Sequence, residues 1–402
     1  MNRTGLTILL VVLLILSVSG SVHARETADM KSPELIFSAE FEGGKLYRSG
    51  EIRVVELNGN YRQMGQQYGM LLKDDLKELY HDAIDKFFIK KKGFSLERLK
   101  TIAGSIFDLY PRRYKEIIYG MAETSGLGAE KQILLNAIEW FPKIKHLSFD
   151  HCSGVAAWGP YTSGGPLVFG RNNDDDSLYK DFARFMVVSV FNADDGTIPA
   201  ALINYAGVIY NATGMNSEGL FIELNSGPWM GFCLDRTSMF VTLFSFLQDY
   251  ASLSEIDNAF NATLPNLSTI VNVADKNRAC SYESSLYDTR RRNPERDGFM
   301  AATNHFMGST WKLTQIDDSV LPTTSYKRYR NLLALGEKYR GKFNPQIMMK
   351  VLDTSIENGG PTDTKETIYQ VIAVPAELKI WLKVPGFQDW TEVGLGPLFR
   401  KN

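Results

Sequence analysis

Two neighbouring stretches of the chain decide the fold. Residues 150–159 read DHCSGVAAWG and residues 167–174 read LVFGRNND, with the turn-prone sequence SGGP between them. Two short apolar runs joined by a turn of glycine and proline are typical of a β-hairpin. This hairpin would place Cys152 at the start of one strand, and Arg171 and Asp174 at the end of the next. A thiol, a guanidinium and a carboxylate would therefore lie close together.

This trio suits nucleophilic catalysis by the thiol of Cys152. A cationic neighbour favours the thiolate over the thiol, and a nucleophile also needs an adjacent base. No histidine stands in an obvious position for that role. If the chain were cut between His151 and Cys152, the new α-amine would have an unperturbed pKa of about 7.7 to 8. That pKa lies near working pH, where a general base is most effective.

The remaining pattern separates helices from strands in blocks. Residues 25 to about 145 are mostly amphipathic, with one alternating stretch near the front. The chain after Cys152 contains many short apolar runs divided by turns. Helices are expected at 70–80, 94–124 with a break at Pro111, 133–141, 238–247, 253–260 and 325–340. Strands are expected at 51–57, 152–158, 167–171, 185–191, 200–205, 208–212, 270–274, 367–374 and 379–384. Such segregation favours an α+β architecture of layers.

The first residues read as a secretory signal peptide. Arg3 precedes an apolar run from Leu6 to Val18, and small residues precede a cleavage position after Ala24. A retained anchor is the alternative, but a run of this length falls short of the roughly 20 residues that a membrane-spanning helix needs. We expect residues 1–24 to be removed, and the mature protein to be secreted or periplasmic with no stable membrane span.

Composition narrows the function classes. The 402 residues carry a formal net charge of -2, with 44% hydrophobic and 22% charged residues, so no strong field selects nucleic acid. The five histidines are scattered, and no cysteine pair has metal-ligand spacing. We therefore expect no metal and no other cofactor. Of the three cysteines, Cys233 and Cys280 could form a disulfide, or all three could be buried thiols.

Several motifs together resemble the N-terminal-nucleophile (Ntn) hydrolase superfamily. The similarity is to the isopenicillin N acyltransferase-like family, related to choloylglycine hydrolase and penicillin V acylase. The matching residues are Gly65 and Gly69, Cys152 through Gly154, Gly170 through Asp174, Gly214 through Leu220 followed by Asn225, Ala302 through Phe306, and Ser325 through Arg328. Each motif alone is weak, and their shared order makes the resemblance specific.

The resemblance implies a role for each matching residue. Cys152 is similar to the nucleophile that self-cleavage after His151 exposes, Arg171 to the arginine beside the thiol, and Asp174 to the carboxylate that holds the α-amine. Asn225 is similar to an oxyanion-hole asparagine, Asn304 to a second active-site asparagine, and Arg328 to a late active-site arginine. Donors of this kind stabilise the charge that develops on a carbonyl oxygen.

The resemblance also implies an architecture and a substrate class. It implies a four-layer αββα sandwich, in which residues 25–151 form a mostly helical small subunit and residues 152–402 the catalytic large subunit, both from one precursor. The substrate would be a small-molecule N-acyl amide or acyl thioester, with hydrolysis and acyl transfer both open. The substrate itself is not predicted, because fold does not fix function.

Two other functions stay open from the sequence. Cys152 and His305 could form a papain-like pair, although Cys152 opens a strand and lacks that family's flanking pattern. The chain could also be an exported binding protein that has lost catalysis. In a purely structural interpretation, Arg171 and Asp174 would be a surface ion pair of little energetic weight.

Overall fold

Two β-sheets form the centre of the structure. The computed structural model describes residues 35–144, 151–175, 177–210, 212–294, 296–312 and 324–400. The predicted signal peptide, residues 1–24, lies outside these ranges. A ten-stranded sheet has the order β1-β2-β3-β6-β7-β8-β9-β10-β11-β12, and a six-stranded sheet has the order β13-β4-β5-β14-β15-β16.

Neighbouring strands run antiparallel, except that β3 and β6 are parallel. The ten-stranded sheet contains β1 (Ile36–Phe41), β2 (Gly44–Ser49), β3 (Ile52–Gly59), β6 (Met186–Ala193), β7 (Ala200–Tyr205), β8 (Thr213–Asn216), β9 (Phe221–Ser226), β10 (Thr269–Ala274), β11 (Ala279–Ser284) and β12 (Thr289–Arg292). The six-stranded sheet contains β13 (Phe299–Ala302), β4 (Ser153–Ala157), β5 (Val168–Asp174), β14 (Thr367–Val374), β15 (Lys379–Val384) and β16 (Gln388–Gly394).

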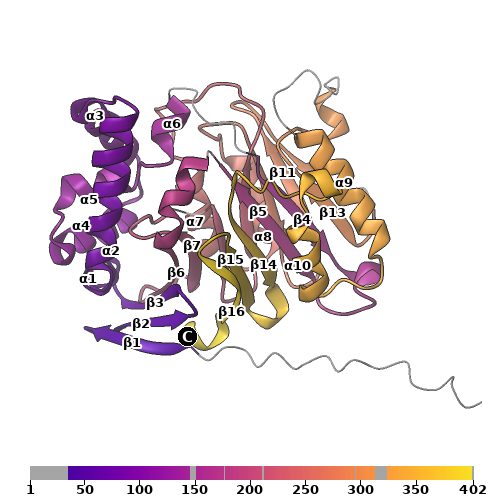
Figure 1. Cartoon of the computed structure of the whole chain (residues 1–402), viewed down its shortest axis with the longest axis horizontal. Coiled ribbons are helices and arrows are strands. Elements are labelled where there is room, and N and C mark those ends of the chain that lie inside the picture. The colour runs from indigo at the N-terminus through magenta and orange to yellow at the C-terminus, as the bar shows by residue number, and fades with distance from the viewer. Residues whose placement is uncertain are drawn as a thin grey trace, which may run out of the picture. The chain divides into compact units, whose positions relative to one another are not determined.

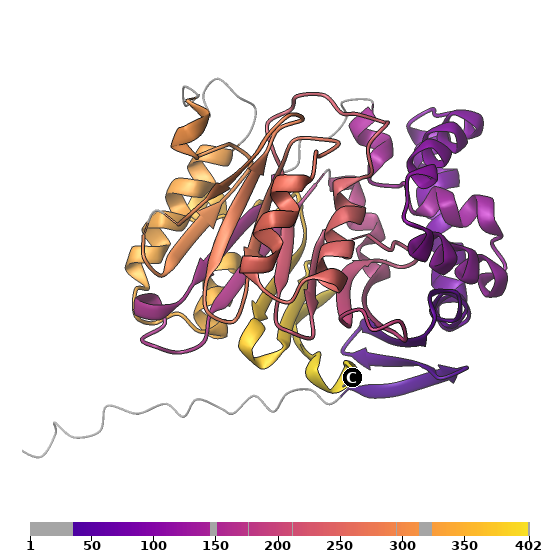
Figure 2. The same ribbon diagram turned by 180° about the vertical axis from the view of Figure 1, so that it is seen from behind.

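Helices cover the outer face of each sheet. Helices α9 (Ser325–Lys338) and α10 (Pro345–Asp353) pack on the six-stranded sheet, and α7 (Met239–Asp249) and α8 (Leu253–Ala262) pack on the ten-stranded sheet (Figures 1 and 2). The inner faces meet where β4 contacts β9 and β13 contacts β11. The predicted four-layer αββα sandwich is therefore confirmed.

The layering explains why the strand sequences are continuously apolar. Every residue of β6, β7 and β14 is buried, because each strand has a helix layer on one face and the other sheet on the opposite face. The core consequently lies between the sheets and beneath the helices. Polar side chains inside it are exceptions that need partners.

The N-terminal part adds a helical layer at one end of the ten-stranded sheet. Its helices are α1 (Tyr61–Leu71), α2 (Lys73–Leu79), the π-helix η1 (Tyr80–Lys91), α3 (Leu96–Asp108), α4 (Arg112–Ser125), α5 (Ala129–Leu135) and α6 (Trp140–Ile144). Asn60 and Gln63 form a capping box at the start of α1, and Gly126 ends α4 with a φ of 76°. The predicted break at Pro111 is confirmed.

This N-terminal part belongs to the same sandwich as the rest. Strand β3 pairs along its length with β6, and β2 contacts β16 of the other sheet. The Ser49 hydroxyl lies 2.7 Å from the Thr391 hydroxyl and donates to the main-chain oxygen of Glu392. Residues 35–144 and the chain after Cys152 therefore share one core.

Some predicted elements were wrong or missing. The predicted strand 208–212 is wrong, because residues 208–210 form a loop and β8 begins at Thr213. Asn136 accounts for this loop, because its side chain bonds the backbone of Gly207 and Ile209 in place of a neighbouring strand. The first helix begins earlier than the predicted 70–80, because α1 begins at Tyr61 and contains Gly65 and Gly69. The elements that were not predicted are strands β1, β2, β9, β11, β12, β13 and β16, the π-helix η1 and helix α10.

Position 65 of α1 is a glycine because α1 and α4 cross at very short distance. A Cβ added to Gly65 would lie 2.2 Å from the main-chain oxygen of Ile117, and one added to Gly120 would lie 2.3 Å from that of Arg62. These positions need glycine for space rather than for backbone freedom. In the ranges given above, no helix combines the length and apolar character that spanning a membrane requires.

We predict opposite effects of alanine at two helical glycines. Gly65→Ala should destabilise the fold by about 1 to 3 kcal/mol through overpacking. Gly104→Ala in α3 is the matched control, since a Cβ there meets no atom within 4 Å, and it should stabilise by about 0.5 to 1 kcal/mol. Urea denaturation of both variants measures the difference. Equal effects would contradict the close crossing of α1 and α4.

Candidate active site

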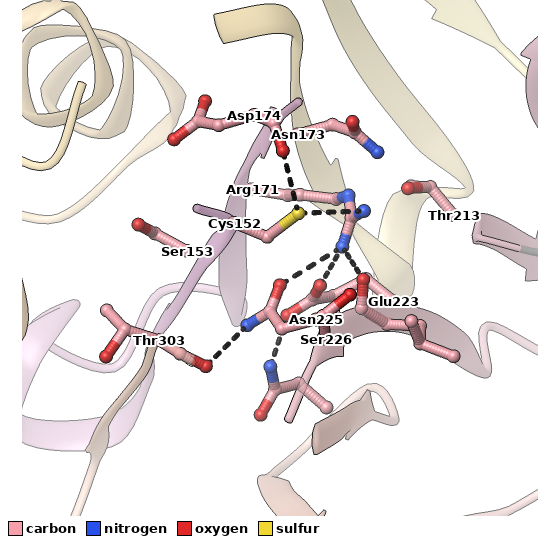
Figure 3. Close-up of polar contacts among 12 residues, drawn as sticks. Cys152, Ser153, Arg171, Asn173, Asp174, Thr213, Glu223, Asn225, Ser226 and Thr303 are labelled. Carbon is pink, nitrogen blue, oxygen red and sulfur yellow. Dashed lines mark hydrogen bonds and ion pairs between the residues drawn. The ribbon is translucent and has the colours of Figure 1, made fainter. Parts of the chain in front are cut away.

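The predicted hairpin forms and sets the site between the two sheets. Strands β4 and β5 pair antiparallel, with Gly154 opposite Arg171. Cys152, immediately before β4, is buried. Its Sγ lies 3.9 Å from Nη2 of Arg171 and donates to the main-chain oxygen of Asp174 at 3.6 Å (Figure 3). The hairpin thus brings the thiol next to a fixed cation.

Arg171 links the two sheets through a buried ion pair. Its Nη1 bonds the carboxylate of Glu223 on β9 and donates to the main-chain oxygen of Leu224 at 2.7 Å. Nη1 also lies 3.4 Å from Oδ1 of Asn225. The interpretation of Arg171 and Asp174 as a surface ion pair is therefore wrong, because both are buried and the partner of Arg171 is Glu223.

Glu223 explains a glycine of the cysteine motif. Its carboxylate also accepts a hydrogen bond from Asn272 on β10. A Cβ at Gly154 would lie 2.2 Å from Oε1 of Glu223, so the strand after Cys152 has no room for a side chain there. Burial raises the pKa of Glu223, and the charge of Arg171 opposes that shift.

Asp174 is a buried carboxyl group of a different kind. Among the described residues, neither of its carboxylate oxygens has a hydrogen-bond partner. Burial raises the pKa of Asp174 to about 7, although Arg328, Thr367 and His151 each lower it. A carboxylate without hydrogen bonds in the interior is costly, and neutralisation is the usual response.

The peptide bond between His151 and Cys152 is held on both sides. The main-chain nitrogen of His151 donates to the main-chain oxygen of Asp174 at 3.4 Å. On the other side, Nη1 of Arg328 donates to the main-chain oxygen of Cys152 at 2.7 Å and to the Ser153 hydroxyl at 2.8 Å. The main-chain oxygen of Asp174 thus contacts groups on either side of this bond.

The two predicted asparagines come from different parts of the sandwich: Asn225 lies on β9, and Asn304 lies in the loop after β13. Asn225, on β9, donates from Nδ2 to the main-chain oxygen of Thr303 at 3.5 Å, which is long for a hydrogen bond. Asn304 accepts from Arg328 at 2.8 Å and donates to the main-chain oxygen of Ser226 at 2.9 Å. Asn304 is therefore firmly fixed, whereas the Asn225 amide makes only long hydrogen bonds among the described residues.

His305 does not serve as a base for Cys152. Its Nδ1 lies 2.7 Å from the Ser325 hydroxyl, and its Nε2 lies 2.9 Å from Sδ of Met307. Its ring also stacks on Tyr326 at 3.7 Å between centroids. Burial first, and then the charge of Arg328, lower the pKa of His305 to about 3. These contacts argue against the papain-like alternative.

The other predictions about cysteines and metals concern positions away from Cys152. Cys233 and Cys280 are both free thiols, so the disulfide between them is absent. Within the described part of the chain, no group of three or more His, Cys, Asp or Glu side chains is placed to hold a metal ion.

Sequence reasoning missed Glu223, which fixes Arg171. A detectable signal was present, because Glu223 stands two residues before Asn225 in the apolar segment FIELNS. Alternate residues of a strand point to the same face. A carboxylate in a buried strand, two positions from a proposed site residue, therefore predicts a partner for the buried arginine.

Comparisons with known proteins give distant similarities. No family model matches the sequence. The protein dcd1B of Dictyostelium discoideum is 29% identical over 161 residues, an alignment covering 34% of this chain and 31% of that protein. This chain thus aligns with about a third of the length of that relative.

The solved structures that match this protein have low sequence identity to it. A Caenorhabditis elegans ortholog of N-acylethanolamine-hydrolyzing acid amidase has 20% identity and a TM-score of 0.44, covering 59% of this chain and 95% of that one. Mutant conjugated bile acid hydrolase of Clostridium perfringens has 12% identity and a TM-score of 0.44, covering 62% and 95%. Penicillin V acylase of Agrobacterium tumefaciens has 11% identity and a TM-score of 0.43, covering 62% and 89%.

We predict that Asp174 makes stability depend on pH. Because the folded-state pKa is raised to about 7, its stabilising contribution is complete below the unfolded pKa of about 3.9 and is lost as pH rises towards 7. The slope would be at most about 1.4 kcal/mol per pH unit. The free energy of unfolding of Cys152→Ala should therefore fall relative to Cys152→Ala/Asp174→Asn between pH 4 and 8. Parallel pH profiles would contradict the raised pKa.

Proposed function

We propose that this protein is a cysteine hydrolase that cuts itself between His151 and Cys152 and then hydrolyses a linear amide. The observation that carries this proposal is the buried, unpartnered carboxyl group of Asp174. It belongs to the residue whose main-chain oxygen contacts both His151 and the thiol of Cys152. An α-ammonium group released at Cys152 would give this carboxylate a direct partner of opposite charge.

The commitment of His305 to other partners supports the same proposal. Its two ring nitrogens contact Ser325 and Met307, so this ring is not available to take the proton of the Cys152 thiol. The α-amine of a new N-terminus would be attached to the nucleophile itself, so it needs no further residue to place it.

The proposed self-cleavage needs only groups of this chain and water. The Sγ of Cys152 attacks the carbonyl carbon of His151, and the bond from that carbon to the nitrogen of Cys152 breaks. The thiol proton passes to the departing nitrogen, which leaves His151 as a thioester on Sγ. Water then hydrolyses the thioester to a carboxylate on His151 and regenerates the thiol.

Turnover repeats this chemistry on a small-molecule amide. The α-amine takes the thiol proton, and the thiolate, favoured by Arg171, attacks the acyl carbon. Because the hydrogen bond that the Asn225 amide donates is long, this amide is the donor best able to turn towards the developing oxyanion. The leaving amine takes the proton back, and water resolves the acyl-enzyme. A second amine in place of water would make the same site an acyltransferase.

The proposal includes two chains that stay together outside the cytoplasm. The small chain would comprise residues 25–151 and the large chain residues 152–402, and the pairing of β3 with β6 would hold them in one core. Export rests on the signal peptide expected at residues 1–24.

The test is amine release from a panel of N-acyl amides of different acyl length. We expect wild-type protein to run as two bands on a denaturing gel and to release amine from at least one compound. Cys152→Ala should remain one band and release none, whereas Cys233→Ala, at a cysteine outside the site, should behave as wild type. An intact Cys152→Ala chain that releases amine as fast as wild type would refute the proposal.

A second prediction concerns the oxyanion donor. Asn225→Ala should lower kcat by about 10²- to 10³-fold, because it removes a donor that acts on the transition state. KM should change much less, since the ground-state carbonyl gains little from that donor. The measurement uses fully processed protein and the best amide of the panel. An unchanged kcat would exclude Asn225 as the donor.

A further inference from the structure

His151 is held by a side chain outside the motifs already described. Its Nδ1 pairs with Oε2 of Glu366, and the His151 side chain is only 12% exposed, against 33% for Glu366. Within the described ranges, Nε2 of His151 is buried without a hydrogen-bond partner. Glu366 is therefore the polar anchor of this ring. The residue that supplies the scissile carbonyl therefore has a largely buried and anchored side chain.

Glu366 is itself fixed against the strand that carries the site. Its main-chain oxygen accepts from the main-chain nitrogen of Asp175 at 3.1 Å, and the next residue, Thr367, pairs with Asp174. The Asp363 carboxylate caps the turn before it, accepting from the main-chain nitrogens of Lys365 at 2.8 Å and Glu366 at 3.3 Å. The backbone that carries the Glu366 carboxylate is thus hydrogen-bonded to the residue that follows β5.

The scissile peptide consequently has fixed points on either side. Arg328 holds the main-chain oxygen of Cys152, and Glu366 holds the ring of His151. The main-chain oxygen of Asp174 also accepts from the nitrogen of His151. The carbonyl carbon that Cys152 must attack lies between these contacts.

We propose that Glu366 is a positioning residue for self-cleavage. By holding the His151 ring, it fixes the orientation of the His151 carbonyl group relative to the Cys152 thiol. This inference rests on the proposed function and adds the residue that prepares its first step. A misplacement of about 1 Å at a reacting atom costs on the order of 100-fold in rate, so loss of this anchor should be visible in the cleavage rate.

The pair also explains why histidine at position 151 suits this fold. An aliphatic side chain there would leave the Glu366 carboxylate without its partner at a half-buried position. Removing either member should therefore have the same consequence as removing both, because the two groups act as one unit.

The experiment follows the conversion of one chain into two on denaturing gels after refolding. Glu366→Ala and His151→Ala should each slow conversion by about 10- to 100-fold, and the double variant should be no slower than the slower single variant. Glu366→Gln, which keeps an oxygen acceptor for the ring, should be closer to wild type than Glu366→Ala. The matched control is Glu357→Ala, which removes an exposed carboxylate from the 3-10 helix Ile356–Asn358 and should leave conversion at the wild-type rate.

Each outcome separates this inference from the proposed function. An intact wild-type chain would refute the proposed self-cleavage itself. Conversion of Glu366→Ala at the wild-type rate, with Cys152→Ala still intact, would refute the role of Glu366 alone. Equal slowing by Glu366→Ala and Glu366→Gln, with additive loss in the double variant, would also overturn it. Matching thermal unfolding of Cys152→Ala with and without Glu366→Ala confirms that the fold is unchanged.

Discussion

The ion pair between Arg171 and Glu223 joins the two sheets at the point where the site lies. Arg171 belongs to β5 of one sheet and Glu223 to β9 of the other, and both side chains are fully buried. Burying two charges costs several kcal/mol each unless further hydrogen bonds compensate. Leu224 and Asn272 supply such bonds. Gly154 leaves the space that the carboxylate needs. The position of Arg171 beside Cys152 is therefore set by the packing of the whole sandwich.

Asp174 contrasts with this satisfied pair. It lies at the end of the same strand as Arg171, and it is equally buried, but its carboxylate has no partner among the described residues. The Glu223 carboxylate has Arg171 and Asn272 as partners, whereas the Asp174 carboxylate has none among the described residues. We infer that a positive charge is added beside Asp174 after the chain has folded. In the mechanism that we propose, the α-ammonium group of Cys152 is that charge. Self-cleavage would then give the Asp174 carboxylate an ionic partner, which would stabilise the cleaved protein relative to the intact chain.

The sequence predicted the layers and the hairpin well, for identifiable reasons. Turn residues separate apolar runs of strand length after Cys152, so β4, β5, β7, β14 and β15 stand close to their expected bounds. Strands β1 and β2 were missed because their residues are mostly polar or exposed, which hides the alternation. Residues 208–210 were mistaken for part of a strand because they are buried and mostly apolar, while the Asn136 side chain bonds the backbone of Gly207 and Ile209.

Some residues of the site were likewise predicted from the sequence, and others were not. The order of the motifs predicted six site residues, and the structure connects them in one network of contacts. Arg171, Asp174 and Arg328 contact Cys152, whereas Asn225 contacts Arg171 and Asn304 contacts Arg328. Two further partners in the site, Glu223 and Glu366, were not predicted from the sequence. Glu223 and Glu366 lie 52 and 215 residues from Arg171 and His151, and only the folded sheets bring them together. The position of Glu223 two residues before Asn225 was a local signal for its role, whereas no local pattern marks Glu366.

The mass and N-terminal sequence of the catalytically active chain test the central claim most directly. We expect protein that releases amine to contain a large chain beginning Cys152-Ser153-Gly154, with a free α-amine and with the small chain still bound. Amide hydrolysis at full rate by a chain whose bond between His151 and Cys152 is intact would contradict the proposed role of the new N-terminus.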